Sequence, residues 1–179
     1  MNRYPEAYIE YLVCFHAGRD YFECHEVMEE FWKEHPGDPR GRTYVGLIQI
    51  AVGLYHQRRG NRAGAVKMLG SSLKNLVPEH AEELGLDHGK LIECVAQRVE
   101  LLSTGGEVVY EDLNLPIKDD KLLAHCTKLC EERGLMWGEP GDSGKPGLIH
   151  KHTLRDRSEV IQERARQVEM KKKRRGETP

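Results

Sequence analysis

Residues 22–32 read FECHEVMEEFW, an amphipathic pattern with the period of an α-helix. Glu26 and Glu30 fall on its solvated side. His25 and Glu29 lie four residues apart at the edge of the apolar side, where two such side chains meet on a helix surface. The stretch therefore predicts a packed helix with an imidazole–carboxylate pair, which would fix the tautomer of the histidine. The apolar side itself consists of Cys24, Val27, Met28, Phe31 and Trp32.

Residues 43–59, TYVGLIQIAVGLYHQRR, are apolar almost all round, which predicts a buried central helix. One stripe differs from the rest: Gly46, Gln49, Gly53 and His56. Each glycine costs a helix interior about 1 kcal/mol relative to alanine, so two of them indicate close packing. Buried polar groups need partners. We expect the helix of residues 22–32 to supply them, which gives a predicted cluster of His25, Glu29, Gln49 and His56.

The remaining periodicity predicts an all-α fold, a compact multi-helix bundle made of helical hairpins. The break at residues 36–39 and the glycine at position 60 separate the first hairpins, and Asp20 is placed to cap the second helix. Residues 107–115 look extended, but one short strand cannot pair alone, so we expect a packed loop. Helices are predicted at residues 4–17, 20–35, 41–59, 61–76, 87–103, 119–133 and 154–173.

Charge divides the chain unevenly. Residues 1–137 carry 16 Lys and Arg against 22 Asp and Glu, whereas residues 138–179 carry 11 against 7. Glycine and proline dominate residues 138–150, which predicts a flexible linker. We therefore predict a helical bundle domain over 1–137 and a basic helical tail over 151–179. Such a tail could contact a protein partner, nucleic acid or an anionic surface.

Cysteine usage and hydropathy indicate the compartment. The chain has five cysteines without the spacing of a disulfide framework, and Cys126 and Cys130 are predicted to be buried apolar thiols. No apolar run reaches the roughly 20 residues that a transmembrane helix needs. The N-terminus lacks the features of a secretory signal. These features predict a cytoplasmic protein with reduced thiols and no membrane span.

Several motifs together resemble the bacterial and archaeal domain-of-unknown-function family 309. They are Phe22-x-x-His25-Glu26-x-x-Glu29-x-x-Trp32, then Gly46-Leu-Ile-Gln49-x-Ala51, Tyr55-His56 and Gly60-Asn61-x-x-Gly64-Ala65. The resemblance is good over residues 10–76 and loose elsewhere. It implies an all-helical fold. Families of this kind have been described, by inference, as metal-dependent hydrolases, and no established activity comes with the resemblance.

The candidate site supports two interpretations. His25, Glu29 and His56 could hold a divalent metal with two nitrogens and a carboxylate, and Glu26 or Glu29 could then act on an activated water. Against this, the helix offers His-Glu-x-x-Glu and not the His-Glu-x-x-His that supplies two ligands. The other interpretation is a hydrogen-bonded His–Glu–Gln–His network at a helix seam, which we favour.

A second candidate site is a basic spot where two helices meet. Arg58 and Asn61 lie at this junction, where a helix N-terminus could bind an anion; with Gln49 they are the predicted ligand-binding residues. The sequence as a whole predicts a non-enzymatic helical module that binds a partner through its basic tail. A metal-dependent hydrolase is the alternative, and nucleic-acid association through the tail is the third hypothesis.

Overall fold

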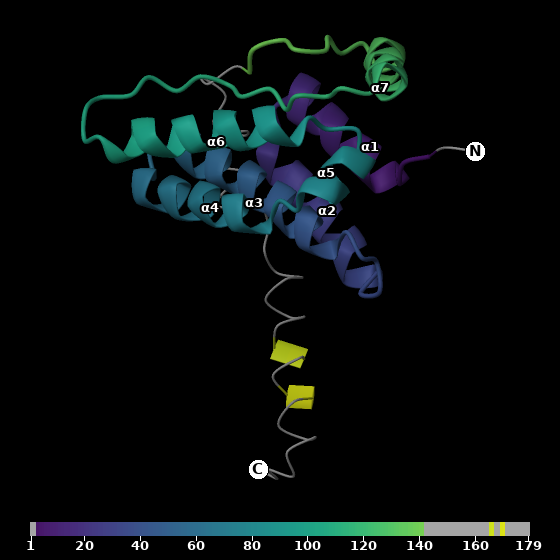
Figure 1. Ribbon diagram of the computed structural model, residues 1–179, viewed down its shortest axis with the longest axis horizontal. Coiled ribbons are helices and arrows are strands. Elements are labelled where there is room, and N and C mark those ends of the chain that lie inside the picture. Colours follow the sequence, from purple (N-terminus) through teal and green to yellow (C-terminus); the bar gives the residue numbers. More distant parts are fainter. Residues whose placement is uncertain (1–2, 142–164, 167–168, 171–179) are drawn as a thin grey trace. The chain divides into compact units, whose positions relative to one another are not determined.

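The computed structural model describes residues 3–141, 165–166 and 169–170. In these residues the protein is all-α, as predicted, and no β-strand is present; one isolated bridge joins Leu86 and Ile117. Figure 1 shows the order of the elements along the chain. They are α1 (Glu6–Val13), the π-helix η1 (Cys14–Gly18), α2 (Tyr21–Glu34), α3 (Gly41–Arg58), α4 (Arg62–Asn75), α5 (Pro78–Glu83), α6 (His88–Ser103) and α7 (Asp120–Glu132).

Side-chain caps begin four of these helices. Asp20, Asn61, Asp87 and Asp119 each accept a hydrogen bond from a backbone N–H in the first turn of α2, α4, α6 and α7, respectively. A cap of this kind satisfies one of the N–H groups that a helix start leaves without a partner. The helix starts after Asp20 and Asp87 are therefore at the predicted places.

Two local features differ from the sequence prediction. The first predicted helix, residues 4–17, is α-helical only to Val13 and continues as the π-helix Cys14–Gly18. The short helix α5 was not predicted: it lies between the predicted helices 61–76 and 87–103. Pro78 stands at the start of α5, where its missing N–H costs nothing and its fixed φ suits the first turn.

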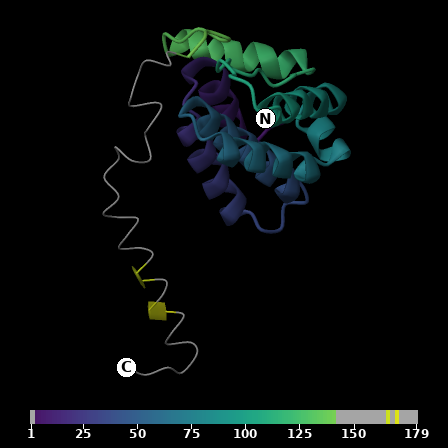
Figure 2. The same ribbon diagram turned by 90° about the vertical axis from the view of Figure 1, so that its left-hand side faces the viewer.

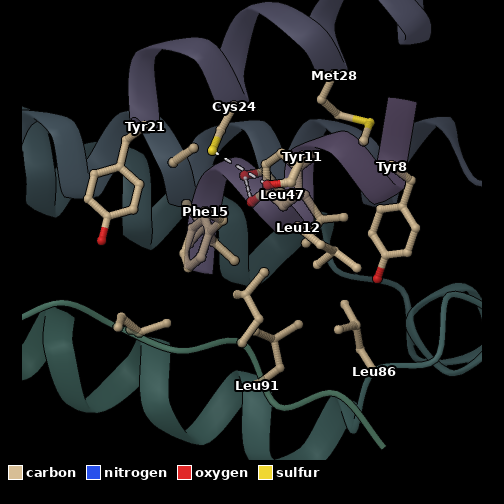
Figure 3. Close-up of a cluster of buried hydrophobic side chains, with 14 of the residues drawn as sticks. Tyr8, Tyr11, Leu12, Phe15, Tyr21, Cys24, Met28, Leu47, Leu86 and Leu91 are labelled. Carbon is tan, nitrogen blue, oxygen red and sulfur yellow. Dashed lines mark hydrogen bonds between the residues drawn. The ribbon is translucent and has the colours of Figure 1, made fainter. Parts of the chain in front are cut away.

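The core lies between α1, α2, α3 and α6 (Figure 3). Tyr11 and Leu47 are both completely buried, and the hydroxyl of Tyr11 donates to the carbonyl oxygen of Leu47 at 2.8 Å. Tyr8 bonds the carbonyl oxygen of Leu84 in the same way, also at 2.8 Å. Buried tyrosines are tolerated because each hydroxyl finds an acceptor. Cys126 and Cys130 on α7 are also buried, as predicted.

The chain between α6 and α7, residues 104–119, is a long loop that runs back along α6 (Figure 1). Leu113 and Leu115 of this loop are buried, so the predicted packed loop is confirmed. After α7, the ring of Trp137 stacks on that of His16 with centroids 4.3 Å apart, and Gly138 donates its N–H to the carbonyl oxygen of His16. Residues 138–141, the start of the predicted linker, thus contact the helical unit.

The remainder of the predicted linker, residues 142–150, lies outside the described residues. Most of the predicted tail helix, 154–173, lies outside them as well. Residues 165–166 and 169–170 are helical and exposed. In Figure 2 the α2–α3 turn (dark blue) lies at the end of the helical unit away from α7 (green). Across the described residues, no helix combines the length and apolar composition that crossing a bilayer requires.

Candidate functional site

The glycine stripe of α3 faces α4, and not α2 as predicted. A Cβ on Gly53 would lie 2.7 Å from Cγ of Leu69, and one on Gly46 would lie 2.9 Å from Cδ2 of Leu76. The polar residues of the stripe, Gln49 and His56, also contact residues of α4 or its N-cap. Gln49 accepts a hydrogen bond from the side chain of Asn75 at 2.8 Å. The glycines therefore allow α3 and α4 to pack closely, which confirms their predicted physical role but assigns them another partner helix.

His56 also turns toward α4. Its Nδ1 lies 3.1 Å from Nδ2 of Asn61, whose Oδ1 accepts the N–H of Gly64 at 3.0 Å. A Cβ on Gly64 would lie 3.0 Å from the ring of His56, so glycine is needed there. Burial, followed by the charge of Arg59, lowers the pKa of His56. Asn61 thus links the end of α3 to the start of α4, whereas the sequence suggested an anion site.

His25 and Glu29 form the predicted pair on α2, with His25 Nε2 3.0 Å from a carboxylate oxygen of Glu29. Lys33 contacts the other oxygen at 2.9 Å. Burial raises the pKa of Glu29, but the hydrogen bond and charge of Lys33 and the charge of His25 outweigh it, so the pKa lies below its usual value. Both side chains of the pair are partly exposed, at 26% and 35%. The predicted four-residue cluster is therefore divided between two different places.

The proposed metal ligands are not assembled. In the part of the chain that the structure describes, no group of three or more His, Cys, Asp or Glu side chains is arranged to hold a metal ion. Packed aromatic rings connect the two histidines: Phe22 contacts His25 and Tyr55, and Tyr55 contacts His56. Glu26, the predicted general base, lies partly buried on α2. A metal role for His25, Glu29 and His56 stays a prediction without support from this geometry.

A different polar site is built around Arg19, which sequence reasoning did not select. Its side chain is 2% exposed, and four hydrogen bonds hold the guanidinium. Nε donates to the carbonyl oxygen of Glu139 at 3.0 Å, and Nη1 donates to those of Phe15 and Leu113. Nη2 donates to Oδ1 of Asn114 at 2.8 Å. One buried cation thus joins η1, the loop 104–119 and the segment after α7.

Asp112 is the anion of this site. It accepts hydrogen bonds from the hydroxyls of Tyr21 and Tyr110, both at 2.8 Å, and from the N–H of Gly141 at 2.7 Å. Its second oxygen lies 3.8 Å from Nε of Arg19. Burial raises the pKa of Asp112, but these donors and the charge of Arg19 outweigh it and lower the pKa. We call Arg19, Tyr21, Tyr110, Asp112 and Asn114 the Arg19 network.

The backbone beside Arg19 is unusual in two ways. The π-helix Cys14–Gly18 leads directly into Arg19, and such insertions occur often at functional sites. Arg19 itself has φ +51°, the one positive value at a non-glycine residue among those described. A left-handed conformation costs an L-residue roughly 1–2 kcal/mol, so the surrounding contacts must hold it. Arg58 is one of them: it donates to the carbonyl oxygen of Arg19 at 2.7 Å and lies over the ring of Tyr21.

The Arg19 network borders a pocket of about 350 Å³. One wall comes from the loop residues Tyr110, Glu111, Asp112 and Asn114, and the other from Gly138, Pro140 and Gly141. Arg19 has five N–H groups, of which four are used by the hydrogen bonds above. Asp112 keeps a lone pair on its second oxygen. The lining of the pocket therefore includes a guanidinium, which can donate, and a carboxylate, which can accept.

His16 contacts both the loop 104–119 and the segment after α7, which line the pocket. Its Nδ1 lies 2.9 Å from the carbonyl oxygen of Leu12, and its Nε2 accepts the N–H of Leu115 at 2.9 Å. These contacts require a neutral ring with the proton on Nδ1. Burial is the main cause that lowers the pKa of His16 to about 4, and it outweighs the hydrogen bond to the Leu12 carbonyl oxygen, which raises the pKa. The imidazole thus fixes the loop 104–119 and, through Trp137, the segment that follows α7.

Comparison with known proteins places the chain in a family. The family described as "Domain of unknown function (DUF309)" matches residues 8–68. The "Uncharacterized protein YpuF" of Bacillus subtilis (strain 168) is 49% identical over 172 residues, which cover 95% of this chain and 98% of the relative. The chain belongs to the DUF309 family. No solved structure matches it significantly.

The family match runs from within α1 to the first half of α4, and the motif residues there have structural contacts. Trp32 packs against Gly41. Gly46 leaves room for the side chain of Leu76, directly after α4, and Gly53 leaves room for that of Leu69 in α4. Asn61 and Gly64 build the turn into α4. The loop 104–119 and residues 138–141 lie outside residues 8–68. The motifs of this DUF309 protein therefore identified its fold, while the pocket depends on chain that they do not include.

Proposed function

We propose that this DUF309 protein is a non-enzymatic module that binds a protein partner, and that the pocket of the Arg19 network is its contact site. The proposal is carried by one observation: a nearly completely buried arginine with a left-handed backbone forms the wall of an open pocket. Strained residues of this kind persist where function requires them, and concave polar sites are the usual places of binding.

The chemistry of the pocket favours binding over catalysis. Among the described residues that line it there is no histidine, cysteine, serine or lysine. The carboxylate that is best positioned, Asp112, has a lowered pKa and three hydrogen-bond donors. A general base near neutral pH needs the opposite, a raised pKa and free access to a proton. The groups present are suited to hydrogen bonding with a ligand.

The test compares two charge reversals on exposed glutamates. Glu111 lines the pocket, and its side chain is exposed, so Glu111→Arg should fill the opening without disturbing the core. Glu100→Arg on α6 makes the same change of charge outside the pocket lining. Both variants should have the helical circular dichroism of the wild type.

The binding measurement uses immobilised full-length protein, with captured proteins identified and then titrated in purified form. We expect Glu111→Arg to weaken binding of such a partner at least about tenfold, a loss of 1.4 kcal/mol, with Glu100→Arg near wild type. Protein ending at Gly141 separates the basic tail from the pocket, since residues 138–141 stay in place. Partners that bind Glu111→Arg and wild type equally would contradict the pocket as contact site.

A further inference from the structure

The loop segment 107–112 that forms one wall of the pocket is an open main-chain edge. No described residue accepts a hydrogen bond from the N–H groups of residues 107–112. The side chains at 107, 109 and 111 are exposed, and those at 108, 110 and 112 are partly buried. This alternation is that of an extended strand with one face on the protein. Val109 is 86% exposed, more than any other large apolar residue described.

Among the described residues, none forms a hydrogen bond with the main chain of Val108, Tyr110 or Asp112. Arg98 of α6 donates to the carbonyl oxygen of Glu111 at 2.8 Å, so the main-chain groups of Glu111 face α6. In an extended chain the N–H and C=O of one residue point to the same side, and those of its neighbours point to the other side. Val108, Tyr110 and Asp112 therefore direct their N–H and C=O groups away from α6, as the edge strand of a sheet would.

We infer that this edge binds an extended segment of a partner protein by strand addition, with the pocket receiving one end of the segment. The inference rests on the proposed function and specifies its ligand. Strand addition obtains affinity from main-chain hydrogen bonds and specificity from alternate side chains. Tyr110, Glu111 and Asp112 line the pocket, so a strand paired with residues 108–112 would lie beside it.

The exposed side chains of the segment specify the chemistry of the partner. Glu107, Val109 and Glu111 alternate on the outer face. Side chains directly opposite each other on paired strands favour opposite charges and β-branched apolar pairs. The partner strand should therefore carry a β-branched residue opposite Val109, flanked two positions away on each side by Lys or Arg.

The same pattern argues against a second copy of this chain as the occupant. Antiparallel pairing of two copies about Val109 places Glu107 of one copy opposite Glu111 of the other. Like charges directly opposite destabilise a strand pair. Parallel pairing in register places each glutamate opposite itself, with the same result.

The probe is a capped synthetic peptide, Thr-Lys-Thr-Val-Thr-Lys-Thr, titrated into the full-length, nitrogen-15-labelled protein. The matched control replaces both lysines by glutamate. We expect the lysine peptide to slow hydrogen exchange at the amides of Val108, Tyr110 and Asp112, but not at those of Glu107, Val109 and Glu111. It should bind about tenfold more tightly than the glutamate peptide. The double variant Glu107→Lys and Glu111→Lys should reverse this preference.

Each outcome decides the inference. Alternating protection together with the reversed preference supports strand addition. Binding without protected amides in residues 107–112 overturns it, as does a dimer of this chain, detected by light scattering, that protects the same amides. Loss of a captured partner in Glu111→Arg, combined with no effect of either peptide, leaves the pocket proposal standing and removes strand addition alone.

Discussion

The hydrogen bonds of Arg19 join residues up to 120 positions apart, from Arg19 to Glu139, whereas the His25–Glu29 pair joins residues four apart. Arg19 is buried, and the contacts around it gather η1, the start of α2, a long loop and the segment after α7. The His25–Glu29 pair lies on one helix, with both side chains partly exposed. Contacts of short range and high exposure contribute little to stability, while a buried charge held by several elements matters for all of them.

This difference predicts where mutation should have its largest effect. Arg19→Met removes the positive charge beside Asp112 and leaves the carbonyl oxygens of Phe15, Leu113 and Glu139 without the guanidinium donor. Breaking a buried ion pair from one side costs about 3–5 kcal/mol. We expect that loss in the free energy of unfolding, measured with urea and circular dichroism.

Arg133→Met is the matched control for this experiment. Arg133 also pairs with a carboxylate, Glu10 at 2.8 Å, but its side chain is 43% exposed. Its loss should cost less than about 1 kcal/mol. If both variants unfold alike, the burial of Arg19 does not hold the three segments together.

The second prediction concerns pH and the support given by His16. The folded pKa of about 4 lies below the usual 6.5, so the folded state prefers the neutral ring. Between these values the unfolded chain binds more protons than the folded one, and stability falls as the pH decreases from 6.5 toward 4. The loss amounts to about 3 kcal/mol at the lower end.

Urea unfolding at a series of pH values checks this slope. His16→Gln should be less stable than wild type at pH 7 but should lose less of its remaining stability down to pH 4. Proton NMR of the wild type gives an independent measurement, because the His16 ring should still be neutral at pH 5. A ring that titrates near 6.5 would disagree with the contacts to Leu12 and Leu115.

The same contrast explains what the sequence could predict. Helix periodicity, capping residues and breaks depend on neighbours along the chain, so the main helices and the His25–Glu29 pair followed from local spacing. The helix that the glycine stripe faces did not follow from local spacing. An apolar helix such as α3 has no single buried face, so its sequence does not indicate which helix packs on the stripe. Its partner, α4, follows only from packing.

The Arg19 network could not be found in this way. Arg19 follows a glycine and precedes a capping aspartate, a context typical of an exposed turn. Its partners lie in a loop and beyond α7, and nothing in the spacing of Asp112 or Asn114 connects them to it. One signal was present: residues 107–115 look extended, which we interpreted as a packed loop, and this segment also carries part of the pocket lining.

The third prediction tests the packing of α3 against α4. Its expected effect is smaller than that of Arg19→Met and larger than that of a substitution in the His25–Glu29 pair. Gly53→Leu places side-chain atoms where Leu69 already lies, and its Cβ alone would be 3.3 Å from the backbone nitrogen of Leu69. Overpacking of this kind should destabilise the protein by more than about 2 kcal/mol. Gly70→Ala on α4 is the control, since its Cβ meets nothing within 4 Å. It should be neutral or stabilise by up to about 1 kcal/mol. Equal melting temperatures for the two variants would mean that α3 packs loosely against α4.

The smallest effect is expected at the site that the sequence favoured. His25→Ala removes an imidazole whose one ion-pair partner, Glu29, keeps its contact with Lys33. A partly exposed pair four residues apart contributes about 0.3–0.5 kcal/mol, so the variant should unfold within that range of the wild type. Because packed rings of Phe22 and Tyr55 connect His25 to His56, we also expect wild type and variant to bind zinc equally in equilibrium dialysis. Stoichiometric zinc that His25→Ala loses would return the metal hypothesis to α2, and would require His56 and Glu29 to approach each other by a movement of α2 against α3.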